Sequence, residues 1–178
     1  MNNEEYTFYT PSPNTPLYEA VEINITGFGP FMSIKENPSW VLGKNIKDNF
    51  DKFFDKSILL GDAREVLVTV KDAISNVEQM YQIMEEKRKK NPKIAQILIH
   101  MGVFAGSGKF TIEKFARNIA SFDSDEGGYN APSIKLLNKY PLYHQLETLV
   151  PVEFIHKYMT VNFAKKKKNL NIKLGNNP

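Results

Sequence analysis

Hydrophobic and polar residues alternate with the period of a β-strand in several parts of the chain. Residues 21–25 and 66–70 place apolar side chains at every second position. The run 94–99 is almost continuously apolar, a pattern typical of a strand that is covered on both faces. Shorter alternating segments at 109–115 and 170–174 predict two further strands.

The segments between these strands carry hydrophobic residues at helical spacing. Asn37 followed by Pro38 predicts the start of a helix that extends to about residue 49, because Asn caps helices and Pro fits the first turn. A second helix is predicted to begin at Asp72 and to end at the basic residues 87–90, and Pro151 begins a third. This alternation predicts an α/β fold with a mostly parallel central sheet, in which ligands bind beyond the carboxyl ends of the strands.

Composition narrows the class of protein. Of the 178 residues, 42% are hydrophobic and 24% are charged, as in ordinary globular domains, and no apolar run approaches the roughly 20 residues of a membrane helix. The polar start of the chain predicts a flexible lead-in over residues 1–18, followed by one α/β domain over 19–178. We expect a cytoplasmic protein, because no apolar leader is visible and cysteine is absent.

The charge of the chain does not point to a nucleic acid or a membrane. The net charge is +3, and the excess lies in the C-terminal lysines, of which four are consecutive at 165–168. We interpret this run as a solvated helix end, because no aromatic residues are interleaved with it. A weaker alternative is a nucleotide- or nucleic-acid-binding domain that uses Ser107, Lys109 and this lysine run.

The common catalytic and cofactor motifs are incomplete in this sequence. The glycine-rich stretch 102–109 lacks the first glycine of a phosphate loop, where Val103 stands, and it has Phe110 in place of the required Ser or Thr. No histidine has a partner at metal-ligand spacing, so we expect no metal and no cofactor. His100 ends the apolar strand and is interpreted as a hydrogen-bonded core histidine. The residue chemistry alone therefore predicts only an α/β domain.

Several longer motifs occur together. Thr-Gly-Phe-Gly-Pro-Phe at 26–31 is followed by Asn-Pro-Ser-Trp at 37–40, and Ile-Leu-Ile-His-Met-Gly-Val at 97–103 is followed by Thr-Ile-Glu-Lys at 111–114. Asn118 and the turn Asp-Glu-Gly-Gly, which begins at Asp125, complete the set. In this combination, from about Val21 to the end, the chain resembles the pyroglutamyl peptidase I family, also called pyrrolidone-carboxylate peptidases.

The resemblance implies a three-layer α/β/α sandwich and a cysteine exopeptidase that removes N-terminal pyroglutamate from peptides. It implies that Glu113 is the carboxylate of a Cys-His-Glu triad. Phe28 and Phe31 would sandwich the lactam ring, and Asn37 would order their loop or touch the substrate. The backbone at 70–71 would hydrogen-bond the lactam. Partners would be peptides or proteins with N-terminal pyroglutamate, and a homo-oligomer is possible in this family.

The resemblance breaks at the C-terminal end. The family continues into a segment like Gly-Arg-Tyr-Leu-Cys, whereas this sequence reads Leu-Gly-Asn-Asn-Pro at 174–178. We therefore expect a fold that lacks its C-terminal strand and helices, together with the catalytic Cys and His, and no peptidase activity. Two hypotheses follow: a truncated pyroglutamyl peptidase, or a non-catalytic module that binds pyroglutamyl peptides or a protein partner.

Overall fold

The computed structural model describes residues 17–103, 109–122, 124–165 and 172–175. The chain divides into two compact units, and each is described on its own. The first comprises the described residues up to Leu67 together with Lys71–Gly102, and the second comprises Val68–Val70 and the described residues from Val103 onward. No helix within the described ranges is long and apolar enough to cross a membrane.

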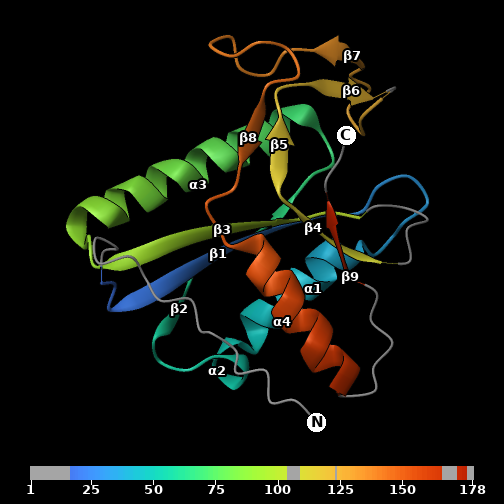
Figure 1. Cartoon of the computed structure of the whole chain (residues 1–178). Coiled ribbons are helices and arrows are strands. Elements are labelled where there is room, and N and C mark those ends of the chain that lie inside the picture. Colours follow the sequence, from blue (N-terminus) through green and yellow to red (C-terminus); the bar gives the residue numbers. More distant parts are fainter. Residues whose placement is uncertain (1–16, 104–108, 123, 166–171, 176–178) are drawn as a thin grey trace. The chain divides into compact units, whose positions relative to one another are not determined.

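The first unit is built on a parallel sheet. Strands β1 (Ala20–Phe28), β2 (Ile58–Val66) and β3 (Ile94–Met101) lie in the order β2-β1-β3. Helix α3 (Val70–Lys90) covers one face of the sheet, and α1 (Pro38–Asp48) with the short α2 (Phe50–Phe53) lies on the other (Figure 1). The predicted α/β layering around a parallel sheet is confirmed.

One face of β1 is pressed against the start of α1. A Cβ atom at Gly27 would lie 2.6 Å from the Ser39 carbonyl oxygen and 2.7 Å from the Trp40 Cα, so only glycine fits there. The helix begins as predicted: the Asn37 side chain accepts a hydrogen bond from the Ser39 N–H, and Pro38 occupies the first turn.

The opposite face of β1 carries a row of buried polar side chains under α3. Glu22 binds Lys87 of α3 at 2.9 Å, and the Asn24 amide donates to Gln96 of β3 at 3.1 Å. The third member, Thr26, bonds His100 of β3. Each buried polar group has a partner, which offsets the cost of removing it from water. Beside this row, α3 buries the thioether side chains of Met80 and Met84.

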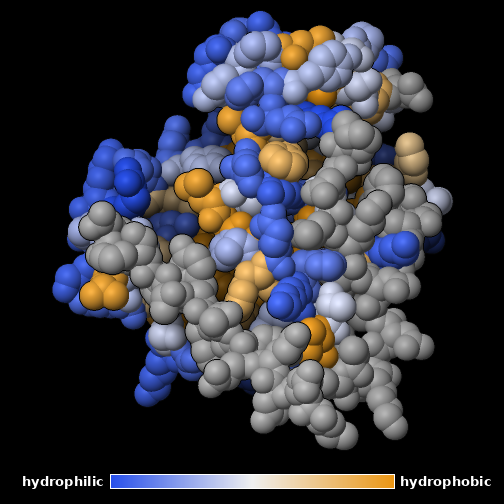
Figure 2. All heavy atoms as spheres, viewed as in Figure 1, coloured by the Kyte–Doolittle hydropathy of each residue, from blue (hydrophilic) through white to orange (hydrophobic). Residues whose placement is uncertain are grey.

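The second unit consists of short strand pairs and one helix. Strand β4 (Phe110–Glu113) pairs in parallel with β9 (Ile172–Gly175), while β5 (Phe115–Arg117) and β8 (Gln145–Glu147), and β6 (Ala120–Phe122) and β7 (Ala131–Ile134), form antiparallel pairs. Helix α4 (Val152–Lys165) begins directly after Pro151, as predicted. Its Phe154 and Tyr158 rings stack at 6.4 Å and are exposed. On the face in Figure 2, exposed apolar side chains lie between hydrophilic ones.

Two strand predictions were wrong in position. The alternating segment 66–70 is not a strand: β2 ends at Val66 and α3 already begins at Val70. The predicted strand 109–115 is interrupted at Lys114, where the chain passes from its pairing with β9 to its pairing with β8. The run 94–99 is a strand as predicted, but it is half-buried rather than covered on both faces. Short alternating runs do not reveal where pairing partners end.

Replacing Gly27 with alanine is expected to destabilise the first unit by roughly 1–3 kcal/mol, because the methyl group meets rigid backbone atoms of α1. Gly29→Ala is the matched control: its methyl group would meet only the flexible end of the Glu65 side chain, at 2.8 Å. Urea unfolding followed by circular dichroism measures both variants. Equal losses in the two variants would contradict the close approach described here.

Candidate functional site

The loop between β1 and α1 is fixed by the buried side chains of Asn37 and Ser39. The Asn37 amide donates to the Gly29 carbonyl at 2.9 Å, and its oxygen accepts from the Ser39 hydroxyl at 2.7 Å. That hydroxyl oxygen in turn accepts the Phe28 N–H at 2.9 Å. Of the two roles considered for Asn37, the structure therefore shows the ordering of the loop.

Phe28 and Phe31 lie at the two ends of the Gly-Pro segment in this loop. Both side chains are half-buried, and the Phe28 ring packs beside Gly102, where an added Cβ would lie 3.7 Å from the ring. Phe31 forms an isolated bridge with Ile34, which closes a tight turn with Met32 at a φ of 48°. The carboxyl ends of β1 and β3 thus carry one aromatic ring directly at the sheet edge where ligands of α/β folds bind.

Glu113 belongs to the second unit, at the end of β4. Its register partner in β9 is Gly175, and the space that a side chain at Gly175 would occupy is filled by the Glu113 carboxylate. Gly175 is buried, whereas Glu113 is exposed. The last described residue of the chain is therefore in contact with the carboxylate that the family resemblance assigns to a triad.

Lys114, the residue after Glu113, forms ion pairs with other carboxylates. Lys114 forms ion pairs with Glu147 at 3.0 Å and with Glu153 of α4 at 2.5 Å. Hydrogen bonding to Glu153 and Glu147 raises the pKa of Lys114, and the same contact with Lys114 lowers the pKa of Glu153. The ion pairs of Lys114 are thus with Glu147 and Glu153 and not with Glu113.

Asn118 organises a loop of the second unit. The buried Asn118 amide nitrogen lies 2.9–3.1 Å from the carbonyl oxygens of Leu137, Tyr140 and Pro141, and its oxygen accepts the Leu137 N–H at 2.6 Å. The Tyr140 ring stacks on His144 at 4.4 Å. This motif residue therefore has a structural role that the sequence did not reveal.

Asp125 holds the segment between β2 and α3. One carboxylate oxygen accepts the Val70 N–H at 2.8 Å, and the other accepts those of Gly127 and Tyr129 at 2.9 and 2.8 Å. These hydrogen bonds, led by that from Val70, lower the pKa of Asp125. The expectation that the Val70 backbone binds a lactam is wrong for its N–H, because Asp125 occupies that donor.

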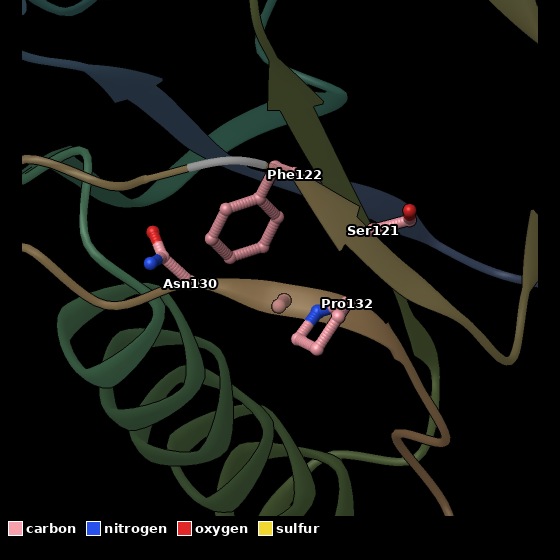
Figure 3. Close-up of a pocket in the computed structure, with 5 residues that line it drawn as sticks. Ser121, Phe122, Asn130 and Pro132 are labelled. Carbon is pink, nitrogen blue, oxygen red and sulfur yellow. The ribbon is translucent and has the colours of Figure 1, made fainter.

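Two surface depressions, each of about 470 Å³, are formed within single units. The first lies between β6 and β7, where Figure 3 shows Phe122 beside Asn130 and Pro132. The second adjoins the loop before α1 and is lined by Asn37, Trp40, Lys44 and Glu65 among others. Of the predicted site residues, Asn37 lines the second of these two depressions. The described residues contain no cluster of His, Asp and Glu able to hold a metal ion.

Solved structures of pyrrolidone carboxyl peptidases match this chain. The enzyme from Thermococcus litoralis matches with a TM-score of 0.66 at 22% identity, covering 86% of this chain and 60% of that one. The enzymes from Fervidobacterium islandicum AW-1 (22% identity) and Pyrococcus furiosus (19% identity) each match with a TM-score of 0.63, covering 87% of this chain and 64% of theirs.

These matches confirm the predicted resemblance at the level of the fold. The chain spans 60% of the length of the Thermococcus litoralis enzyme and 64% of the other two. No family model matches the sequence, and no curated protein matches it.

Asp125→Asn tests the carboxylate that binds Val70. Asparagine keeps one acceptor oxygen for Gly127 and Tyr129 but turns an amide N–H₂ toward the Val70 N–H. Because the pKa of Asp125 is lowered in the folded state, its contribution is complete above the ordinary pKa of about 3.9 and is lost as pH falls through the folded value. The urea midpoints of the two proteins should differ near pH 7 and converge in acid. A constant difference at all pH values would contradict this assignment.

Gly175→Ala tests the contact with Glu113. The added methyl group would meet only the carboxylate end of the exposed Glu113 side chain, which can rotate away, so we expect a loss of at most about 1 kcal/mol in the free energy of unfolding. In a Glu113→Ala background most of this loss should disappear, because the obstructing side chain is gone. Additive losses in a double-mutant cycle would show that the two residues are not in contact.

Proposed function

We propose that this chain binds the N-terminal pyroglutamate of peptides at the loop between β1 and α1. The observation that carries the proposal is the buried Asn37–Ser39 hydrogen-bond cluster, which fixes Phe28 and Gly29 of the loop at the carboxyl edge of a sheet with the pyrrolidone carboxyl peptidase fold. The motif residues of this loop are the same ones that carry the sequence resemblance.

The chemistry of the ligand suits such a loop. Pyroglutamate ends in a small, flat, uncharged lactam ring with one N–H donor and one carbonyl acceptor. Aromatic side chains provide apolar walls for a ring of this kind, and a few polar groups fix its orientation. A free N-terminal glutamine carries an ammonium group in the same place, and removing that charge from water costs more than removing the neutral lactam N–H.

Peptide hydrolysis by this 178-residue chain is not part of the proposal. In the family that the chain resembles, a cysteine attacks the amide, and this sequence contains no cysteine. Removal of the nucleophile from a triad lowers the rate by several orders of magnitude. Glu113, by that resemblance, would orient and stabilise an imidazolium, a role that contributes nothing without the nucleophile.

Calorimetry with pyroglutamyl-alanine and glutaminyl-alanine tests the binding. We expect the pyroglutamyl peptide to bind at least tenfold more tightly, a difference of about 1.4 kcal/mol. Phe28→Ala should weaken its binding by a similar factor. The matched control is Phe53→Ala, which removes a 58% exposed phenylalanine of α2 and should leave binding unchanged.

The same titrations can also contradict the proposed binding. Equal affinity for the two peptides would contradict recognition of the lactam, and equal effects of Phe28→Ala and Phe53→Ala would contradict its placement. A fluorogenic pyroglutamyl amide should be released at the rate of the uncatalysed reaction. Turnover that survives Glu113→Gln would overturn the role that the family resemblance implies for Glu113.

A further inference from the structure

His100 lies beside Phe28 at the carboxyl edge of the parallel sheet. In the register of β1 and β3, Thr26 is opposite His100; Phe28 ends β1 two residues after Thr26, and Gly102 directly follows the end of β3. Because side chains alternate between the faces of a strand, Thr26 and Phe28 share one face with His100. The Phe28 ring lies near Gly102, where an added Cβ would be 3.7 Å from it.

The hydroxyl of Thr26 determines which nitrogen of His100 carries the proton. Thr26 is 5% exposed, and its Oγ1 lies 2.7 Å from His100 Nδ1, the one side-chain hydrogen bond of Thr26 within the described residues. A buried hydroxyl proton needs an acceptor, and Nδ1 is the acceptor within reach. We therefore assign the acceptor role to Nδ1, which places the proton of the neutral imidazole on Nε2.

The Nε2–H group is a donor without a protein acceptor in the described part of the chain. His100 forms a hydrogen bond as predicted, but it is exposed, so its interpretation as a core histidine was wrong. Partial desolvation of the ring lowers the pKa of His100, which favours the neutral form. The Thr26 bond fixes the plane of the ring. The ring of His100 thus presents an oriented neutral N–H donor at the sheet edge. Phe28 lies two residues beyond Thr26, the strand partner of His100.

We propose that His100 is a ligand-binding residue, whose Nε2–H donates a hydrogen bond to the ring carbonyl oxygen of a lactam lying on Phe28. This inference rests on the proposed function and extends it, because it names the group that recognises the carbonyl. The carbonyl is the feature that separates pyroglutamate from a plain five-membered ring. Thr26 is then a positioning residue, which acts through the orientation and tautomer of His100.

Two ligands of equal ring size separate this role from a merely structural one. Pyroglutamyl-alanine carries the ring carbonyl, whereas cyclopentanecarbonyl-alanine has neither carbonyl nor N–H in its ring. His100→Ala should weaken binding of the first about tenfold or more and leave the weak binding of the second unchanged. His100→Gln, which retains an N–H donor, should recover part of the loss. Thr26→Val should weaken the first ligand alone, by a smaller factor.

The outcomes distinguish this inference from the proposed function. If the wild-type chain prefers pyroglutamyl-alanine but His100→Ala weakens both ligands equally, lactam binding stands and the role of His100 is wrong. If the wild-type chain binds neither ligand, both fail. The ¹⁵N chemical shifts of the His100 ring provide a readout without ligand: they should show the Nε2–H tautomer, and an Nδ1–H tautomer would overturn the inference whatever the binding results.

Discussion

The contact between β1 and the first turn of α1 is the constraint on which the first unit depends. At Gly27 the helix backbone comes so close to the strand that no side chain fits between them. This approach allows Ser39 to accept the Phe28 N–H, and Asn37 to cap the helix while it binds the Gly29 carbonyl. The nine residues that connect the strand to the helix are thereby held from both ends by buried hydrogen bonds.

The two faces of β1 have different roles: one packs against α1, and the other leads to the proposed binding site. The face against α1 is close-packed, whereas the face under α3 carries the polar row Glu22, Asn24 and Thr26, each member satisfied by a neighbouring element. A fully apolar face would pack as well in energetic terms, since buried polar pairs contribute little net stability. At its end, however, the row places a histidine with a fixed orientation beside an aromatic ring. The polar row therefore continues without a break into the edge where a ligand is proposed to bind.

Much of this arrangement could be predicted from the sequence where the signals are local. The Asn-Pro start of α1 and the parallel α/β layering follow from cap chemistry and periodicity, and both are confirmed. The strand predicted at 66–70 was wrong because alternation of apolar residues also occurs outside strands. The backbone N–H of Val70 in this segment binds Asp125, more than 50 residues away. The contact of Glu113 with Gly175 and the exposure of His100 likewise depend on strand register, which no short pattern encodes.

The most direct test of the account is to observe which protons of the protein lie against a bound lactam. In the complex of the full chain with pyroglutamyl-alanine, intermolecular nuclear Overhauser effects should connect the ring methylene protons of the ligand to the aromatic protons of Phe28 and Phe31. Effects that connect these methylene protons instead to Trp40, or to the rings of Phe122 and Tyr129 near β6 and β7, would contradict the account.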